Sequence, residues 1–447
     1  MSHQRVDLTE GNLLKGILTL AWPVIVANLL QTAYNIVDAF WLGKLGKEAF
    51  SAPTIAWPVI FTGISFAFGI SVAANSLVAQ YAGSGDKRSA ELMSAQAMVL
   101  SILISSVLIV VGLFFSKPIL ALMGAKGEIL EMSSTYLQII LLGSPLLFAM
   151  FAGVGALRGW GNSKIAMHFT IISVALNVVL DPLMIFGIGF PRMGVAGAAL
   201  ATVVSRSIAA IYGFYVLLSG RVGMKIHWDD FAPRWNFMKK VFVVGLPVGF
   251  GNSVTSLGFA FIMGVVARFG SVVVSAYGVG NRIISVITMF SGGIAAAIAS
   301  AVGQSLGAGK PERAVSAVKL GSLVNFTTVT IFCVFTFFFG KYLTRFFIND
   351  PEVVEMGEIF FRLVSFSVPF FTTMQTVLAA LDGSGRTVKS TMVNVVRLWG
   401  VRVPMVLYMA KAFGFAGIFY AMIVSNIAAL LLALSVVIFS KWQEKII

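Results

Sequence analysis

The sequence is built from long apolar runs joined by short polar segments, and polar and apolar positions do not alternate within a run. A helix of about 20 apolar residues crosses a bilayer. Unbroken runs of this kind favour helices over the alternating strands of a membrane barrel. The pattern therefore predicts an all-α integral membrane protein with twelve transmembrane helices. The expected spans cover residues 16–42, 53–82, 91–115, 133–157, 165–187, 194–218, 237–267, 273–306, 315–339, 357–381, 389–411 and 416–439.

The apolar pattern occurs twice along the chain. A shift of 224 residues places PVIVAN, which contains Pro23, on PVGFGN, which contains Pro247. The same shift places Gln80 on Gln304. Further on, at a slightly shorter offset, GVAGAALATVVS matches GFAGIFYAMIVS. Because the match persists over most of each half, the sequence predicts two homologous halves.

The two halves are expected to enter the membrane in the same orientation, because each contains an even number of spans. This arrangement is an internal parallel repeat about an axis along the membrane normal, and transporters built this way hold their substrate between the repeats. We expect an N-terminal six-helix lobe at 1–218, a cytoplasmic linker at 219–236 and a C-terminal six-helix lobe at 237–447.

Composition and charge agree with a membrane protein. Hydrophobic residues make up 58% of the chain and charged residues 11%, whereas soluble domains carry about 25% charged residues. The net charge of +14 does not indicate a nucleic-acid partner here. Alternate connections, including both tails, carry about twice as many Lys and Arg as the others, which marks them as cytoplasmic. We therefore expect a multi-pass protein of the cell membrane with both termini in the cytoplasm.

Two acidic residues lie inside apolar spans, namely Asp38 in the first and Asp181 in the fifth. The matched positions of the second half hold Ile262 and Val403. A structural role common to both halves therefore cannot explain the acids. Acids inside a membrane are energetically costly and tend to mark ion or proton pathways. The pair is predicted to be functional.

Polar neighbours extend each acid into a stripe, because residues three or four apart share a helix face. The members are Asn28, Gln31, Asn35 and Asp38, with Tyr34 beside them, on the first span; Thr170, Ser173, Asn177 and Asp181 on the fifth; and Thr202 on the sixth. A close carboxylate pair can share one proton. Hard oxygen ligands can also hold Na+, here from Asp38, Asn177, Asp181 and Thr202. The residues leave H+ and Na+ both open, and no resident cofactor is expected.

Arg397 and Arg402 lie in the eleventh span and have no counterparts in the first half. Such side chains either face a water-filled cavity or extend their charge to an interface. We therefore count them, with Gln31, Asn35 and Ser173, as candidate cavity-lining residues.

Enzymatic functions are not favoured. The stretch Gly83-Ser84-Gly85-Asp86 spells the G-x-G-D pattern of intramembrane aspartyl proteases, but Lys87 and Arg88 follow it in a polar loop. The glycines are typical of a turn, and the second half has no acid there. No P-loop spacing indicates ATP hydrolysis. A channel is the other alternative, and it would conduct without saturable exchange.

The double-six repeat and three stretches resemble the multidrug and toxic compound extrusion (MATE) transporters. The stretches are TAYNIVDAFWLGKLG, ALRGWGNSK and LNVVLDP, and the likeness covers essentially the whole chain. An acidic pair confined to the first half resembles the DinF-like branch.

The resemblance implies a V-shaped pair of six-helix lobes around a central cavity, and cation-coupled efflux of amphipathic, often cationic, drugs. It places the first-lobe cation site at Asp38, Asn177, Asp181 and Thr202, with Tyr34 adjacent. It also implies a hinge at Pro23, since a proline removes a helix hydrogen bond and favours a kink.

We expect an antiporter that works by alternating access and takes up H+ or Na+ outside as substrate leaves. A flippase for lipid-linked oligosaccharides or other lipid substrates is the alternative, since it shares the architecture and would suit Arg397 and Arg402. The expected partners are small amphipathic molecules and the bilayer. A monomer suffices, because the two halves already form the cavity.

Overall fold

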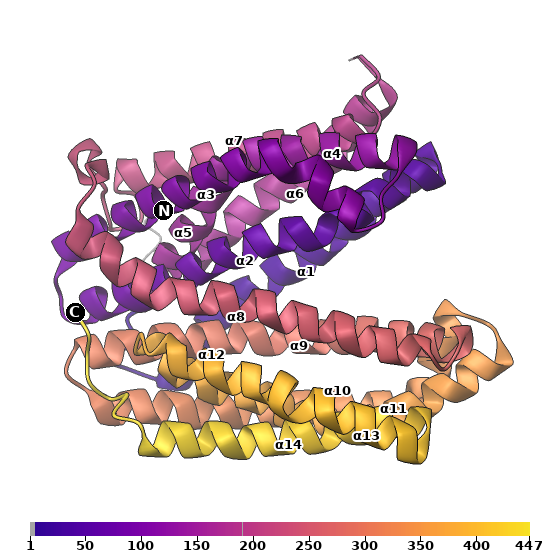
Figure 1. Ribbon diagram of the computed structural model, residues 1–447. Coiled ribbons are helices and arrows are strands. Elements are labelled where there is room, and N and C mark those ends of the chain that lie inside the picture. The colour runs from indigo at the N-terminus through magenta and orange to yellow at the C-terminus, as the bar shows by residue number, and fades with distance from the viewer. Residues whose placement is uncertain (1–4, 190) are drawn as a thin grey trace. The chain divides into compact units, whose positions relative to one another are not determined.

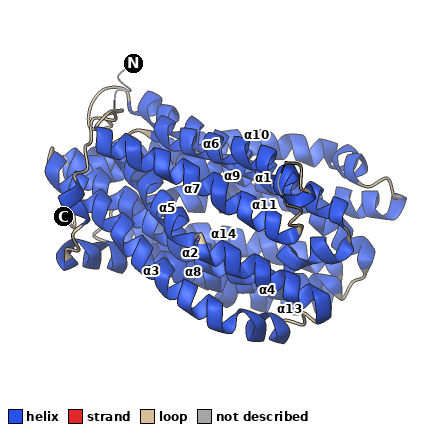
Figure 2. Cartoon of the chain, turned by 90° about the horizontal axis from the view of Figure 1, so that it is seen from above, coloured by secondary structure: helices blue, strands red, loops and turns tan. Residues whose placement is uncertain are grey.

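The computed structural model describes residues 5–189 and 191–447. Across these residues the chain forms helices joined by short turns, and no strand is present there (Figure 1, Figure 2). The first repeat contains α1 (Leu13–Leu45), α2 (Lys47–Gly83), α3 (Lys87–Leu122), α4 (Gly127–Leu142), α5 (Ser144–Trp160), α6 (Ser163–Phe186) and α7 (Val195–Ser219).

The second repeat follows a single turn of 3-10 helix, η1 (Trp228–Phe231). Its elements are α8 (Trp235–Ala267), α9 (Ser271–Gly307), α10 (Pro311–Phe347), α11 (Pro351–Gly383), α12 (Thr387–Val395), the π-helical segment η2 (Val396–Arg402), α13 (Val403–Phe413) and α14 (Phe415–Phe439).

The predicted all-α membrane architecture is confirmed. Eleven helices in the described part of the chain are long and apolar enough to cross a membrane, or up to twelve when α4 and α5 count as one bent span. The predicted fourth span, residues 133–157, is bent in the structure, because α4 and α5 meet at an angle of 52° at Gly143. Pro145, in the first turn of α5, has no N–H to continue the helical ladder. The Ser144 hydroxyl donates to the Leu141 carbonyl instead, at 2.6 Å.

The eleventh span also departs from a simple helix. Between α12 and α13 the chain widens into the π-helical turns of η2, which end directly before Val403 and Pro404. A proline ring clashes with the carbonyl four residues before it, and a wider turn relieves that clash. The matched Pro182 lies inside α6 without such a segment.

The chain divides into two compact units. The first contains Val26–Gly249 with the described residues up to Asp7, and the second contains Leu8–Ile25 and Phe250–Ile446. The division runs through α1 after Ile25 and through α8 after Gly249, two positions that the repeat places on each other. The lobe boundary expected in the linker at 219–236 stays a prediction.

Glycines set the close helix contacts within each unit. In the first unit, a Cβ on Gly69 of α2 would lie 2.3 Å from the Gly245 carbonyl oxygen of α8. In the second unit, a Cβ on Gly293 of α9 would lie 2.5 Å from Ile25 of α1. Gly293 is the repeat partner of Gly69. Small residues allow helix backbones to approach closely in membranes, so the sequence repeat is also a packing repeat.

Candidate functional site

A cavity of about 330 Å³ lies within the first unit, among α1, α2, α4 and α7. Asp38, Tyr34 and Asn35 line it from α1, and Thr202 lines it from α7. The other lining residues are Pro53, Thr54, Trp57, Ile60, Ile64, Tyr136, Ile140 and Arg206. The structure thus brings residues of the predicted first and sixth spans to one cavity.

Helix geometry places the carboxylate and its neighbours. Tyr34 and Asp38 are one helical turn apart on α1, so both side chains reach the same side. The Tyr34 hydroxyl shares a hydrogen bond of 2.6 Å with the Thr202 hydroxyl. Because both residues are buried, this bond fixes the α1–α7 contact beside Asp38.

The fifth span supplies a second carboxylate. Asp181 and Asn177 are both fully buried on α6, and the Asn177 amide donates to Asp181 Oδ1 at 2.8 Å. This is the i, i+4 pair that the sequence indicated. Neither residue lines the cavity, but Asp181 interacts electrostatically with Asp38. The structure therefore brings the two acids of the first repeat into one electrostatic cluster.

Three oxygens of this cluster have no hydrogen-bond donor among the described residues, namely Asp38 Oδ1, Asp181 Oδ2 and Asn177 Oδ1. A buried carboxylate oxygen that lacks a partner is energetically costly. A proton on one carboxyl group, or a hard cation shared by the oxygens, would satisfy them. The donor set therefore fits either of the coupling ions that the sequence left open.

The remaining predicted residues lie in different places. Asn35 lines the cavity, whereas Gln31 and Ser173 do not. Ser173 is buried on α6. Pro23 lies inside α1, in the part that belongs to the second unit. Thr202 and Tyr34 line the cavity together with Asp38.

Sequence reasoning missed Arg206, Tyr136 and Trp57, which all line the cavity. The Arg206 guanidinium carbon lies 5.2 Å from the centroid of the Tyr34 ring, and it interacts electrostatically with Asp38. Its sequence signal was its position four residues after Thr202, on the same face of α7. The site therefore contains two acids and one base.

Arg397 and Arg402 belong to the second unit, and neither lines this cavity. Arg402 donates from Nε to the Ser425 hydroxyl at 2.8 Å and from Nη2 to the Asn426 side-chain oxygen. Arg397 is stacked over the Phe371 ring at 4.6 Å, and its Nε and Nη1 have no partner among the described residues. Both guanidinium groups are buried.

The repeat partners of the acids are apolar. Ile262 and Val403 lie in a hydrophobic core cluster of the second unit, with Phe360 and Phe361. The G-x-G-D aspartate, Asp86, caps α3 by accepting from the Ser89 N–H at 2.9 Å. That backbone hydrogen bond lowers the pKa of Asp86, as suits an exposed helix cap and not a protease centre.

A comparison with known protein families also detects the internal repeat. A sequence model described as MatE matches residues 23–183 and again residues 247–407, which confirms the repeat at its offset of 224. The probable multidrug resistance protein YpnP of Bacillus subtilis is 30% identical over 92% of this chain and 92% of its own length. The FAD transporter of Shewanella oneidensis is 26% identical, over 95% and 94%.

Solved structures agree at the level of the fold. A crystal structure of MATE in complex with MaL6 has a TM-score of 0.89 and 26% identity, and the match covers 95% of this chain and 96% of that one. The doubled family match, the helical membrane architecture and the likeness over nearly the whole length lead to one conclusion. The chain belongs to the MATE family of multi-pass membrane transporters and is not an enzyme.

Proposed function

We propose that this protein exports amphipathic, often cationic, drugs or toxic organic compounds in exchange for H+ or Na+. Relatives that match it over nearly their full length are named multidrug resistance proteins. The observation that carries the coupling proposal is the set of partnerless oxygens on Asp38 and Asp181. Both acids belong to the first repeat only, so they serve something other than the shared fold.

The charge of the cluster favours one cation per cycle. Asp38 and Asp181, both ionised, carry two negative charges, and Arg206 supplies one positive charge nearby. The remaining negative charge is neutralised by one H+ or one Na+. The cation site is proposed to use Asp38, Asn177, Asp181 and Thr202, with the Tyr34 hydroxyl holding Thr202 in place.

Ion binding must favour one conformation to drive transport, since equal binding to two states shifts no equilibrium. α1 offers a path for this coupling. It carries Asp38 in the first unit, while its part up to Ile25, including Pro23, belongs to the second. Pro23 interrupts the helical hydrogen-bond ladder. We infer that neutralising the cluster changes the bend of α1 at Pro23 during alternating access.

The orientation follows from charge. The connections richer in Lys and Arg are proposed to face the cytoplasm, together with both termini. The protein is proposed to act as a monomer, with the coupling ion as its sole small-molecule requirement besides substrate. The flippase alternative gains no support from the relatives, whose names indicate drug resistance or transport of FAD.

The test is transport of a fluorescent cationic dye by the purified protein in liposomes, under a pH gradient alone and then a sodium gradient alone. Asp38→Asn should insert normally and lose the response to the effective gradient. Glu48→Gln, which removes an acid at the start of α2 outside the cavity, should keep it.

Undiminished transport by Asp38→Asn at equal protein content would refute coupling at this site. Movement driven by one gradient only would identify the ion. If neither gradient moves any of several dyes, FAD should be tested next, because one relative is named for it. FAD uptake without dye uptake would replace the proposed substrate class.

A further inference from the structure

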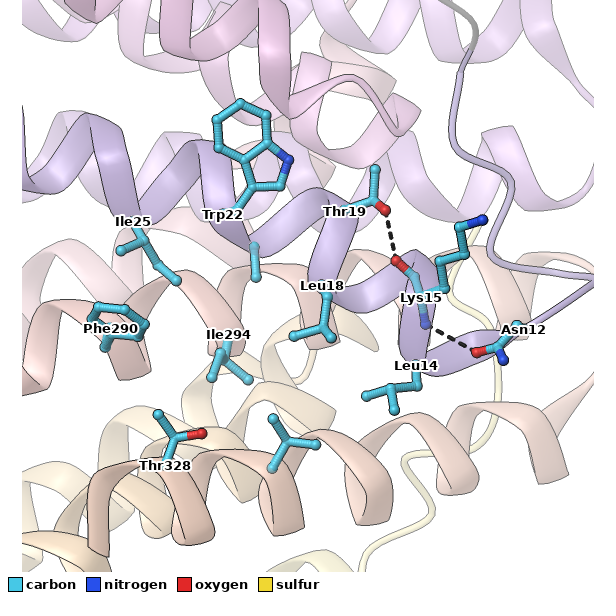
Figure 3. Close-up of a pocket in the computed structure, with 12 residues that line it drawn as sticks. Asn12, Leu14, Lys15, Leu18, Thr19, Trp22, Ile25, Phe290, Ile294 and Thr328 are labelled. Carbon is cyan, nitrogen blue, oxygen red and sulfur yellow. Dashed lines mark hydrogen bonds between the residues drawn. The ribbon is translucent and has the colours of Figure 1, made fainter. Parts of the chain in front are cut away.

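A second cavity, of about 550 Å³, lies within the second unit and shares no lining residue with the cavity at Asp38. It is formed by the first half of α1 together with α9 and α10 (Figure 3). Its wall is largely apolar, with Leu14, Leu18, Ala21, Trp22, Ile25, Phe290, Ile294 and Val324. Leu18 and Trp22 are 43% and 44% exposed, so this groove is open to the surroundings of the protein.

The groove is amphipathic along its length. Asn12 and Lys15 lie at one end and Ile25 and Phe290 lie at the other (Figure 3). Along the apolar part, from Leu14 to Ile25, the helix rises about 17 Å at 1.5 Å per residue. One leaflet of the hydrocarbon core is about 15 Å thick. The apolar part is therefore long enough for an acyl chain that enters from the polar end.

The polar end carries positive charge. Lys15 makes no ion pair within the described part of the chain. Glu10 is the nearest acid in sequence, and it pairs with Lys310 at 3.6 Å. Arg313 is held close by, donating to the Gly11 carbonyl at 3.0 Å. These charges favour an anionic group at this end.

The start of α1 adds to this preference. The Asn12 side chain caps the helix by accepting from the Lys15 N–H at 3.0 Å, and the first turn contains no acid. The N-terminal end of a helix carries partial positive charge. A membrane protein is surrounded by molecules that combine an apolar chain with an anionic head. Anionic phospholipids gather in the cytoplasmic leaflet, where the start of α1 is expected to lie.

We propose that this groove binds an anionic phospholipid, with an acyl chain along Leu18, Trp22 and Ile25 and the phosphate beside Lys15. The site does not depend on the coupling ion or on the transported substrate. Its lining residues Trp22 and Ile25 flank Pro23 in the sequence, so the bound lipid contacts the turn of α1 that is proposed to bend during transport.

Trp22 provides the measurement. The full-length protein is reconstituted in phosphatidylcholine vesicles that contain increasing amounts of phosphatidylglycerol brominated on its acyl chains. The emission of Trp22 is taken as the difference between the wild type and Trp22→Phe. We expect brominated phosphatidylglycerol to quench it at a mole fraction about three- to fivefold lower than brominated phosphatidylcholine does, as one lysine near an anionic headgroup predicts.

Lys15→Gln should remove this preference and leave quenching equal for the two lipids. Lys239→Gln is the matched control, because Lys239 holds the same place in the second repeat and does not line the groove. It should keep the preference. Equal quenching by both lipids in the wild type would overturn the proposal, as would an unchanged preference in Lys15→Gln. If a transported dye prevents the quenching of Trp22 when it is present at a lower mole fraction than the brominated lipid, the groove binds substrate instead.

Discussion

The two repeats share their helices and close contacts but differ in the charge that they bury. In the first repeat, Asp38 interacts electrostatically with both Asp181 and Arg206, and the two acids lie on continuous helices. The second holds Arg397 and Arg402 on the π-helical segment η2, without an acid paired to either in the described residues. The two halves therefore share their close-packing glycines, while the chemistry diverged at other positions, where the first half holds the acids and the second half holds the core residues Ile262 and Val403.

The largest expected effect concerns the acids of the two repeats. Asp181→Asn should abolish gradient-driven transport, because it removes one of the two carboxylates on which the coupling ion is proposed to bind. Asp382→Asn should retain it. Asp382 belongs to the second repeat and accepts a hydrogen bond from the Ser390 hydroxyl, which an amide oxygen can also accept.

The measurement is dye transport in liposomes at equal protein content, under whichever gradient drives the wild type. Equal loss in Asp181→Asn and Asp382→Asn would show that coupling is shared by both repeats. That result would remove the contrast on which the functional proposal rests.

The second prediction separates the two arginines of the second repeat. Arg402→Met should destabilise the protein by about 1–3 kcal/mol, because it leaves the Ser425 and Asn426 acceptors without their donor. Arg397→Met should be neutral or stabilising. Its Nε and Nη1 lack partners, and replacing a poorly paired buried charge by an apolar side chain often helps.

Thermal unfolding of the purified variants in one detergent would compare them. A loss of stability in Arg397→Met as large as that in Arg402→Met would show that the Arg397 guanidinium is stabilised where it is buried, through its stacking on Phe371. Arg397→Lys is the matched variant that keeps the charge but not the planar donors.

The sequence predicted the spans and the repeat because both depend on local hydrophobicity and on matched spacing. It did not predict the break at Gly143. Pro145 and Pro369 are repeat partners, yet Pro369 lies inside the continuous α11 while Pro145 begins α5. The difference depends on neighbours from other helices, which no local pattern records.

For the functional site, too, the sequence predicted some residues and missed others. The buried acids were visible because charge inside an apolar run is rare, and the Asn177–Asp181 bond follows from helix spacing. Arg206 was missed, although it lies near the middle of the sixth span, because its interaction with Asp38 is visible only once α1 and α7 are placed together. The roles of these residues in coupling stay predictions until transport is measured.

The third prediction exchanges the residues at the break. Gly143→Ser gives the first repeat the residue of the second, Ser367. The new Cβ would lie 2.4 Å from a methyl carbon of Val203, so we expect a loss of about 1–3 kcal/mol from overpacking. Adding Val203→Ala should recover much of it. Ser367→Gly should cost about 1 kcal/mol, through the hydrogen bond of 3.2 Å from Asn426.

Thermal unfolding again provides the comparison. If Gly143→Ser alone is as stable as the wild type, the contact with Val203 does not require a glycine at residue 143. Failure of Val203→Ala to restore stability would instead assign the cost of the serine to the backbone of the α4–α5 turn.

The smallest effect concerns the segments that precede α1 and α8, which are anchored by different chemistry. Before α1, Arg313 donates to the Leu8 carbonyl at 2.7 Å, and carbonyl acceptors do not titrate. Before α8, the Asp230 carboxylate accepts from Arg88 at 2.8 Å and from the His227 N–H at 2.8 Å. The second anchor should therefore depend on pH, and the first should not.

The direction of this pH dependence follows from the pKa shift of Asp230. Burial raises the pKa of this carboxyl group, but the hydrogen bonds from Arg88 and His227 outweigh it and hold the pKa below its ordinary value of about 3.9. The stability that the ionised Asp230 carboxylate gives to this segment is therefore fully present when the pH is above the ordinary pKa. It is lost as the pH falls through the lower pKa of the folded protein. Hydrogen exchange, corrected for intrinsic rates, should show residues 225–234 opening below about pH 4, while residues 8–11 stay protected. Asp230→Asn should open the first of these segments already at neutral pH, and protection that persists in that variant would place the anchor in the Gln96 contacts to the Asp230 and Ala232 carbonyls instead.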